Sequence, residues 1–395
     1  MKVLQINSVC GIRSTGRICT DLADVLFAIG QESLILYGRE SAPSRFSSFS
    51  KKITTDSEVK LHGVCARLFD KAGFVSKRAT ERFIKEIERY NPDIIHLHNL
   101  HGYYLNVETL FEYLKTQDRP VVWTLHDCWA FTGHCSHFSY VGCDGWKKGC
   151  GNCPQIKEYP KSFSDNSAAN FERKRKCFNG VKNMTLITPS NWLAYVVRQS
   201  FLGDYPVVVI PNGIDLDSFK PTDLQIREKY GIGDGKIILG VASAWSERKG
   251  LYDFVRLSEL VSDDYKIVLV GLKDVRGIPE KIITIPHIDG KEELAALYSS
   301  AYVFYNPSRE ETMGLTTVEA MACGAPVAVY DVTAVAETVD KNCGIVIDNC
   351  SVEEFVSNLD KFAELDRTQC ISRAQNYEKN KMFNKYIEIY EELIK

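Results

Sequence analysis

Two series of short apolar runs, each of strand length, constrain the fold of this chain more than any other feature of its sequence. The runs are rich in β-branched residues and lack polar alternation, which is typical of strands buried on both faces of a parallel sheet. Segments of helix length separate them. The first series comprises residues 3–7, 33–37, 93–97, 121–125 and 185–188, and the second comprises residues 207–210, 236–242, 265–270, 301–305, 325–330 and 344–347. Strand–helix alternation in two series predicts two doubly wound, Rossmann-like α/β domains.

The sequence predicts a domain boundary near residues 204–213, where prolines and a glycine interrupt the alternation. We expect an N-terminal domain over residues 1–205 and a C-terminal domain over residues 206–375. The amphipathic segment at about residues 376–395 is expected to form a final helix that crosses back onto the N-terminal domain. Because parallel sheets bind ligands outside the carboxyl ends of their strands, the functional side chains should follow strands.

Composition and charge exclude several classes of protein. The 395 residues are 45% hydrophobic and 25% charged, which is typical of a globular protein with large cores, and the net charge of −3 gives no basic field for nucleic acid. The apolar run at the N-terminus is too short and too polar for a signal peptide. No apolar stretch approaches the roughly 18 residues of a membrane-spanning helix. We therefore expect a cytoplasmic protein.

The first predicted strand leads into a glycine-containing loop, CGIRSTG, over residues 10–16. Gly11 and Gly16 have the spacing of a phosphate-binding P-loop, but Arg17 and Ile18 stand where that loop needs a lysine and a hydroxyl residue. Because isoleucine cannot ligate Mg²⁺, the P-loop signature fails. A glycine turn from a strand into a helix still presents backbone N–H groups to an anion, so this loop is a candidate site for a phosphate compound.

Two glutamates follow the predicted strand at residues 301–305. Glu311 precedes a turn at Gly314, and Glu319 lies within the next predicted helix. Free N–H groups from Gly314 to Thr316 would favour an anion, and the helix rises about 7 Å from there to Glu319. A ligand with a central diphosphate could lie on the helix end with a carboxylate at each flank, because carboxylates accept charge-assisted hydrogen bonds from sugar hydroxyls. The alternative is that both glutamates are solvated acids beside a helix.

The run PSREETMGLTTVEAMACGAPV, residues 307–327, resembles the E-x7-E signature of the retaining glycosyltransferases of family 4, which have the GT-B architecture. IPNGID at residues 210–215 and ERKG at residues 247–250 resemble further motifs of that family in the usual order. HLHNLHG and TLHDCWAFTG resemble first-domain segments of its branch for exopolysaccharides of the colanic acid type, so the resemblance covers essentially the whole chain. It implies two Rossmann-like domains facing each other across a cleft, and a hexosyltransferase activity.

The resemblance also implies roles for individual residues. Glu319 would bind the ribose hydroxyls of the donor, and Glu311 would bind the transferred sugar. Lys249, with Arg248 beside it, would neutralise the diphosphate leaving group. His126 would lie at the reaction centre, where it would hydrogen-bond a sugar hydroxyl or steady the developing oxocarbenium ion. The donor-binding residues are then Gly16, Asn212, Arg248, Lys249, Gly314, Leu315, Thr316 and Glu319, and the catalytic residues are His126 and Glu311.

The function that the resemblance implies is retaining transfer of a sugar from a nucleotide-diphosphate sugar to a saccharide or lipid-linked saccharide acceptor, in surface polysaccharide biosynthesis. Retention is attributed to front-face attack, in which the leaving phosphate helps to deprotonate the acceptor hydroxyl, and no metal or other cofactor is required for catalysis. The sequence departs from the family pattern at Ser243 and Ala244, where an arginine is usual. Two alternatives are a sugar-nucleotide epimerase or hydrolase, and a non-catalytic nucleotide-sugar-binding protein.

Three histidines cluster around the predicted strand at residues 93–97. His96 and His98 alternate along it and therefore share a face, and His101 lies beyond its end. A metal site is one interpretation, but because no matching set of carboxylates accompanies the histidines, packing in the core or in loops is favoured.

The chain has thirteen cysteines, and the odd number, together with thiols inside predicted core segments, argues against a disulfide framework. Cys135, Cys143, Cys150 and Cys153 have the spacing C-x7-C-x6-C-x2-C. Four thiolates at about 2.3 Å would satisfy a structural Zn²⁺ and brace the loop that follows His126. Free thiols, disulfides under oxidising conditions and an iron–sulfur cluster are the alternatives.

Two segments, residues 61–85 and 171–182, combine basic and apolar residues. In the first, the apolar residues at helical spacing are Leu61, Val64, Leu68 and Phe69. Such surfaces could bind an anionic membrane, where a lipid-linked acceptor would lie. The favoured interpretation of each segment is that its apolar residues pack on the domain core and its charges are solvated.

Overall fold

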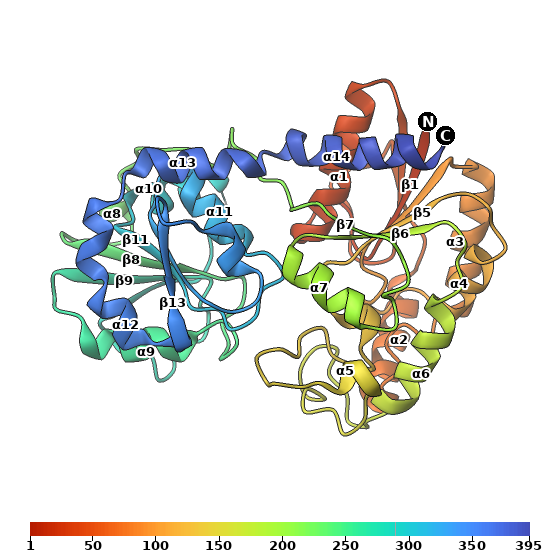
Figure 1. Ribbon diagram of the computed structural model, residues 1–395, viewed down its shortest axis with the longest axis horizontal. Coiled ribbons are helices and arrows are strands. Elements are labelled where there is room, and N and C mark those ends of the chain that lie inside the picture. The colour runs from red at the N-terminus through yellow and green to blue at the C-terminus, as the bar shows by residue number, and fades with distance from the viewer. Residues whose placement is uncertain (289) are drawn as a thin grey trace. The chain divides into compact units, whose positions relative to one another are not determined.

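The computed structural model describes residues 1–288 and 290–395, which form two compact units. Unit 1 comprises Met1–Pro211 and Phe383–Lys395, and unit 2 comprises Asn212–Met382. Each unit is built around its own parallel sheet with helices on both faces (Figure 1). The fold class is therefore the predicted one, with two doubly wound, Rossmann-like domains.

The sheet of unit 1 has the strand order β3-β2-β1-β4-β5-β6-β7, and all its neighbouring strands are parallel. The strands are β1 (Lys2–Asn7), β2 (Glu32–Tyr37), β3 (Ser50–Lys52), β4 (Ile94–Leu97), β5 (Val121–Thr124), β6 (Met184–Thr188) and β7 (Val207–Val209). The helices are α1 (Arg13–Ala28), α2 (Asp56–Phe69), α3 (Lys77–Tyr90), α4 (Val107–Leu114), α5 (Gly145–Lys148), α6 (Ser167–Phe178) and α7 (Asn191–Gln199), with 3₁₀ turns η1 (Ser44–Phe46) and η2 (Trp129–Phe131).

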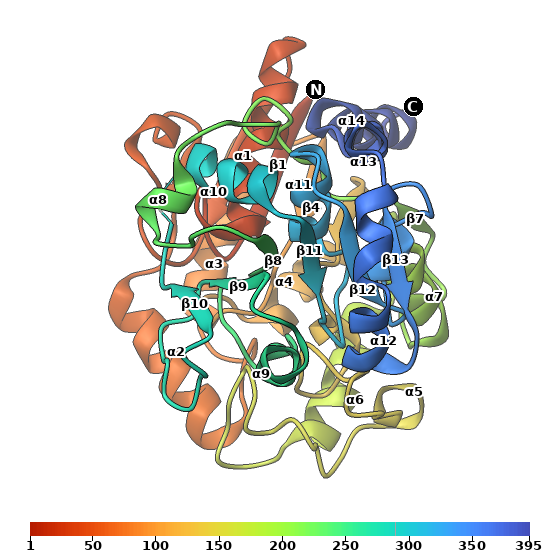
Figure 2. The same cartoon turned by 90° about the vertical axis from the view of Figure 1, so that its left-hand side faces the viewer.

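The sheet of unit 2 repeats this order as β10-β9-β8-β11-β12-β13, again with parallel neighbours. The strands are β8 (Lys236–Val241), β9 (Tyr265–Val270), β10 (Ile282–Ile285), β11 (Val303–Asn306), β12 (Val327–Tyr330) and β13 (Gly344–Ile347). The helices are α8 (Ile226–Lys229), α9 (Leu251–Leu260), α10 (Lys291–Ser300), α11 (Leu315–Ala322), α12 (Val352–Ser357) and α13 (Arg367–Ala374), with 3₁₀ turns η3 (Val335–Thr338), η4 (Asp348–Cys350), η5 (Leu359–Glu364) and η6 (Gln375–Tyr377). Helix α14 (Lys379–Leu393) begins in unit 2 and continues into unit 1. Helices α10, α11 and α13 cover one face, and α9 and α12 cover the other (Figure 2).

One predicted strand belongs to the other sheet. The sequence pattern places residues 207–210 in the second series, but β7 pairs with β6 and extends the sheet of unit 1, with Val208 opposite Ile187. Strands β3 and β10 were not predicted. Both lie at the edge of a sheet, where burial on two faces is not needed, and β3 (SKK) has no buried residue.

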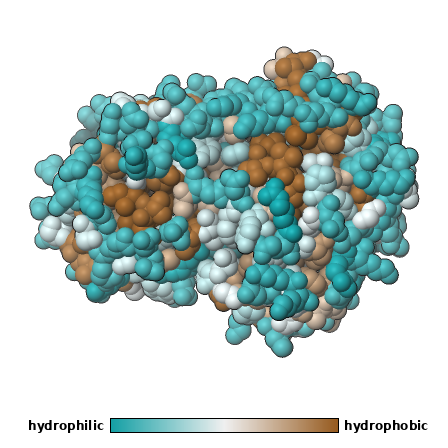
Figure 3. Space-filling view, viewed as in Figure 1, coloured by the Kyte–Doolittle hydropathy of each residue, from teal (hydrophilic) through white to brown (hydrophobic). Residues whose placement is uncertain are grey.

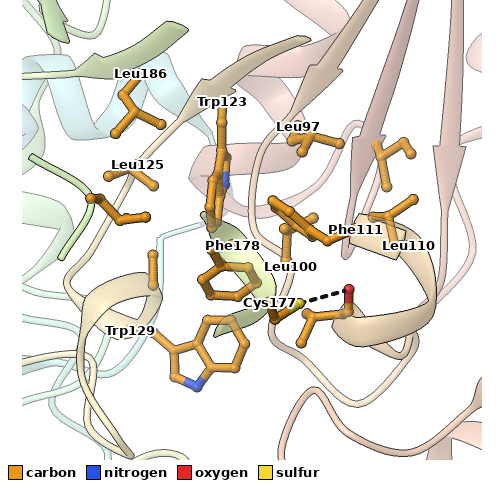
Figure 4. Packing of buried hydrophobic residues seen from close by; sticks show 14 of the residues in the cluster. Leu97, Leu100, Leu110, Phe111, Trp123, Leu125, Trp129, Cys177, Phe178 and Leu186 are labelled. Carbon is orange, nitrogen blue, oxygen red and sulfur yellow. Dashed lines mark hydrogen bonds between the residues drawn. The ribbon is translucent and has the colours of Figure 1, made fainter. Parts of the chain in front are cut away.

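The largest core of unit 1 lies on one side of its sheet, and aromatic side chains fill it (Figure 4). The ring of Phe178 on α6 lies 5.0 Å from that of Trp123 and 4.6 Å from that of Phe111, measured between ring centroids. Cys177 donates a hydrogen bond from its thiol to the carbonyl oxygen of Val107 at 3.3 Å. All four residues of β4 and of β5 are buried, which explains why their sequences show no polar alternation.

Helix α14 returns the end of the chain to unit 1. Tyr386 and Tyr390 are fully buried there. The hydroxyl of Tyr390 lies 2.6 Å from Nδ1 of His96 on β4, and Thr124 on β5 lies 3.5 Å from the hydroxyl of Tyr386. The C-terminal helix is therefore an integral part of the unit 1 core.

The apolar stripe of α2 does not pack on the core, and this overturns the favoured interpretation of the first basic segment. Leu61, Val64, Leu68 and Phe69, named here the α2 stripe, are 61%, 53%, 44% and 50% exposed. The buried residues of α2 are instead His62 and Ala66. On the face of the molecule drawn in Figure 3, hydrophilic residues predominate and apolar residues gather in separate areas.

The second basic segment follows its favoured interpretation in part, because α6 buries Phe171, Cys177 and Phe178 against the core. Its charges are not all solvated, since Lys174 on the same helix is also buried. Within the described residues, no helix is both long enough and apolar enough to cross a membrane.

The burial of α14 predicts a large effect of Tyr390→Ala on the stability of unit 1. We expect the free energy of unfolding to fall by about 3–5 kcal/mol, as for other buried aromatic residues replaced by alanine. Urea unfolding followed by tryptophan fluorescence measures this, because four of the five tryptophans lie in unit 1. The adjacent variant Glu391→Ala changes an exposed side chain and should shift the midpoint little. Equal midpoints for both variants would contradict the packing described here.

Candidate functional site

The predicted site residues follow the strands at which each sheet changes direction. In both sheets the first strand lies in the centre, and the chain fills one side before it crosses to the other. The loops after β1 and β4 in unit 1 therefore lie side by side at one point, as do those after β8 and β11 in unit 2. This switch point is where open parallel sheets bind ligands. Gly16 and His98 follow the first pair of strands, and Lys249 and Glu311 follow the second pair.

A half-buried ion pair joins the two loops of unit 2. The ammonium group of Lys249 donates a hydrogen bond to Oε1 of Glu311, and their side chains are only 22% and 16% exposed. Burial alone would raise the pKa of Glu311, but the adjacent Lys249 and Arg248 outweigh it and lower the pKa below its ordinary value. The structure therefore brings together the predicted donor-binding residue Lys249 and the predicted catalytic residue Glu311 as a charged pair.

Arginine contacts hold the two loops together around this pair. Arg248 donates from Nη1 to the carbonyl oxygen of Glu310 at 2.8 Å. Arg309 forms two hydrogen bonds to the buried carboxylate of Asp253 on α9, at 2.5 and 3.0 Å. Gly250 has a positive φ of 74°, and a Cβ there would lie 2.5 Å from the ring of Pro307. The glycine of the ERKG motif thus lets one loop approach the other.

The helix that carries Glu319 begins at a glycine without a side-chain cap. Gly314 is the N-cap of α11 with φ 90°, and Leu315 and Thr316 form the first turn. Glu319 accepts a hydrogen bond from the hydroxyl of the buried Tyr298 at 3.2 Å, which fixes one carboxylate oxygen on the helix. The uncapped N–H groups and the nearby lysine make the start of α11 a favourable place for a diphosphate.

Asn212 lies at the start of unit 2. Its backbone N–H contacts Sδ of Met313 at 3.1 Å, and its buried side-chain oxygen Oδ1 has no hydrogen-bond partner in the described structure. A buried acceptor without a donor is costly, and a ligand hydroxyl would satisfy it.

The glycine loop of unit 1 is tightly packed. Gly11 has φ 69°, its N–H donates to the carbonyl oxygen of Gly16 at 3.0 Å, and a Cβ on Gly16 would lie 3.1 Å from Val9. Helix α1 also has no side-chain cap and no acidic residue in its first turn. The loop therefore has the backbone features expected of an anion contact, whereas its contact with phosphate stays a prediction.

His126 lies in a small cavity at the carboxyl ends of β4 and β5, beside Asp127 and His101. Burial lowers the pKa of His126 to about 4, so the ring is neutral at physiological pH. His101 contacts Asp127 at 2.7 Å, and although burial would raise the pKa of Asp127, this histidine lowers it to about 2. The neighbouring His96 and His98 are fully buried, which confirms the favoured interpretation that they pack in the core.

The loop after His126 is braced by buried ionisable side chains that sequence reasoning missed. Lys174 on α6 is 1% exposed and donates from Nζ to the carbonyl oxygens of Trp129 and Thr132 at 2.7 and 2.9 Å. Asp70 and His134 form a second buried pair at 2.5 Å. Each partner is far away in the sequence, so spacing alone carries no signal for these pairs.

The four cysteines of the predicted zinc site line one small cavity together with His134. The thiol of Cys135 donates to Cys153 and lowers the pKa of Cys153 below its ordinary value, and Cys150 accepts a hydrogen bond from the N–H of Gly133 at 3.2 Å. All thirteen cysteines are free thiols. Among residues 1–288 and 290–395, no group of three or more His, Cys, Asp or Glu side chains is placed to hold a metal ion. Zinc binding by these thiols therefore stays a prediction.

Comparison with family models decides the family. Residues 16–218 match the model of Glycosyltransferase Family 4, and residues 223–381 match that of Glycosyl transferases group 1. The chain belongs to glycosyltransferase family 4. This family 4 enzyme is 25% identical to WcaC of Escherichia coli K12, named as a colanic acid biosynthesis glycosyl transferase, over the whole of both chains.

Solved structures of low sequence identity establish the same fold. Sucrose-phosphate synthase of Thermosynechococcus elongatus matches with a TM-score of 0.73 at 17% identity, over 99% of this chain and 98% of that one. HepE of Anabaena, solved in complex with UDP-glucose, matches with a TM-score of 0.68 at 15% identity, over 99% and 100% of the two chains. The glycosyltransferase therefore has the GT-B fold.

The buried Lys174 predicts a pH dependence of stability. Burial lowers the pKa of Lys174 to about 7, whereas its ordinary value is 10.5. Between these pH values the unfolded chain binds more protons than the folded one, so the contribution of Lys174 to the free energy of unfolding rises with pH, by at most about 1.4 kcal/mol per pH unit. Lys174→Met removes this term. The unfolding free energy of the wild type minus that of the variant should thus increase from pH 7 to pH 9. A difference that does not change with pH would contradict the assignment.

Proposed function

We propose that this enzyme is a retaining glycosyltransferase that moves a sugar from a nucleotide-diphosphate sugar to a saccharide or lipid-linked saccharide acceptor in surface polysaccharide biosynthesis. The observation that carries the proposal is the half-buried ion pair of Lys249 and Glu311, which precedes the uncapped start of α11. The full-length likeness to WcaC supports a role in polysaccharide biosynthesis, and the likeness to HepE in complex with UDP-glucose supports a nucleotide-sugar donor.

In this proposal the donor replaces the ion pair. Lys249 and Glu311 neutralise each other in the ligand-free protein, because a buried charge without a partner is costly. A diphosphate at the start of α11 would take Lys249 as its counter-ion, and Glu311 would then accept hydrogen bonds from hydroxyls of the transferred sugar. Glu319, one helix turn further along, would accept hydrogen bonds from the ribose hydroxyls.

The same groups would lower the barrier to transfer. When the glycosyl–phosphate bond breaks, negative charge grows on the departing diphosphate. Lys249, Arg248 and the N–H groups of α11 are fixed in place before the reaction, so they stabilise this charge without reorganisation. The acceptor hydroxyl attacks from the same face, and the leaving phosphate takes its proton. Catalysis in this scheme needs no metal ion.

Glu319→Ala tests the donor site. We expect the dissociation constant of the preferred nucleotide sugar to rise by a factor of 10–100, because hydrogen bonds to a charged group contribute about 1.5–3 kcal/mol each. Thermal shift first selects the donor from a panel of nucleotide sugars, and calorimetry then measures its affinity. Glu364→Ala, which removes an exposed carboxylate of unit 2, is the matched control. Equal affinities for both variants would refute the proposed donor site.

We also propose that the α2 stripe attaches unit 1 to the inner face of the plasma membrane, where a polyprenyl-linked acceptor would lie. Three exposed cations, Lys60, Arg67 and Lys71, accompany the stripe on the same helix or directly after it. Asp56 and Glu58, the carboxylates at the start of α2, are paired with Lys52 and Arg82. The face is thus apolar and positively charged, which is the chemistry that binds anionic lipids.

Vesicle sedimentation tests this attachment. The full chain should sediment with vesicles that contain phosphatidylglycerol and much less with phosphatidylcholine alone. Leu61→Gln with Leu68→Gln should reduce binding at least tenfold, because burial of each leucine contributes about 1.5–3 kcal/mol. Tyr195→Gln with Tyr252→Gln removes two exposed aromatic side chains elsewhere and should leave binding unchanged. A similar loss in both double variants would contradict the proposal.

A further inference from the structure

The side chain of Gln5 is held in one orientation at the centre of the unit 1 sheet. Gln5 lies on β1 and is fully buried. Its amide nitrogen Nε2 donates to the carbonyl oxygen of Cys19 at 3.0 Å and lies 3.2 Å from the hydroxyl of Ser33. A carbonyl oxygen only accepts, so the reversed amide would place two acceptors against each other. Oε1 of Gln5 must therefore face the other way, where it lies 3.1 Å from Nε2 of His98.

This orientation fixes which nitrogen of His98 carries a proton. Because Oε1 of Gln5 only accepts, Nε2 of His98 must donate. His98 is 1% exposed, and burial together with His96 and His126 keeps its pKa well below the ordinary value, so its ring is neutral. A neutral imidazole has one donor and one acceptor nitrogen, and Nδ1 of His98 is then an acceptor.

The remaining nitrogen of His98 faces His126. Nδ1 of His98 lies 3.2 Å from Nε2 of His126, and the two rings are within 11° of parallel with centroids 5.5 Å apart. Because the two nitrogens lie much closer together than the two ring centroids do, the rings meet edge to edge, which is the geometry of a hydrogen bond. His96 does not hydrogen-bond to these nitrogens, because the ring nitrogens of His96 face Thr124 and Tyr390.

We infer that Gln5 and His98 are positioning residues that fix the tautomer of His126, with the proton on Nε2 and the lone pair on Nδ1. The carbonyl oxygen of Cys19 accepts from Gln5 and so fixes the orientation of its amide. The amide oxygen of Gln5 then fixes which nitrogen of His98 carries the proton, and His98 in turn fixes which nitrogen of His126 carries it. Neither Gln5 nor His98 was assigned such a role from the sequence.

The consequence for catalysis rests on the proposed function. His126 would accept a hydrogen bond from a hydroxyl of the transferred sugar or the acceptor through Nδ1, and its Nε2–H is committed to His98. Asparagine places an amide oxygen near the position of Nδ1, whereas glutamine reaches the position of Nε2. We therefore expect His126→Asn to keep a kcat about tenfold above that of His126→Gln, which corresponds to one hydrogen bond.

Nitrogen-15 NMR of the free protein with labelled histidines tests the tautomer itself. The chain has eight histidines, and loss of a signal in His98→Gln or His126→Gln assigns each ring. The expected spectrum has the proton of His126 on Nε2, the proton of His98 also on Nε2, and a coupling across the hydrogen bond between Nε2 of His126 and Nδ1 of His98.

A matched pair of variants tests whether the amide of Gln5 fixes the tautomers of the two histidines. Gln5→Met keeps the length of the side chain but removes the acceptor, so both ring nitrogens of His98 should shift toward averaged values, and kcat should fall with little change in the donor KM. Ser33→Ala removes the second contact of Gln5 but leaves the carbonyl oxygen of Cys19, so it should preserve the wild-type spectrum.

A wild-type proton on Nδ1 of His126, or a Gln5→Met spectrum identical to that of wild type, would overturn the inference. The wild-type spectrum decides even if Gln5→Met does not fold. The spectrum needs no substrate, so the inference can fail while the enzyme turns over a nucleotide sugar, and the proposed function can fail while the tautomer is as described.

Discussion

The ion pair between Lys249 and Glu311 is the constraint on which the account of unit 2 depends. In the absence of ligand, the half-buried ammonium of Lys249 and carboxylate of Glu311 stabilise each other. Separating them is favourable only if a new anion binds Lys249 and new hydrogen-bond donors bind Glu311. A nucleotide-diphosphate sugar supplies both. Arg248 and Arg309 hold the two loops at this distance, so the pair is preorganised rather than formed when the donor arrives.

The strand order explains why both units carry candidate sites at comparable places. In each sheet the first strand pairs with the second strand and with the strand that follows the crossover, which leaves two adjacent loops at one end. In unit 2 these loops carry the ion pair, and in unit 1 they carry the glycine loop and His98. His126 follows the next strand, β5, and a buried chain of hydrogen bonds from β1 reaches it through His98. Buried side chains at the centre of the sheet, Gln5 and His98, thus orient the ring of His126 beyond the carboxyl end of β5.

The sequence predicted the two sheets well because strands buried on both faces have no polar alternation. It missed β3, an edge strand of Ser-Lys-Lys, because an edge strand needs no apolar sequence. Helical spacing identified the α2 stripe, but periodicity does not say whether protein or solvent covers a face. Lys249 and Glu311 were each named from the family motifs, but their ion pair was not predicted, because 62 residues separate them and spacing carries no signal at that distance. Lys174 and Asp70 were missed because their partners are set by how a long loop folds.

A crystal structure of the enzyme with a nucleoside diphosphate bound tests the central claim most directly. The account predicts the diphosphate at the first turn of α11, with Nζ of Lys249 moved from Glu311 to a phosphate oxygen and the carboxylate of Glu319 within hydrogen-bond distance of the ribose hydroxyls. A diphosphate bound elsewhere, with the ion pair intact and Glu319 still turned only to Tyr298, would contradict it.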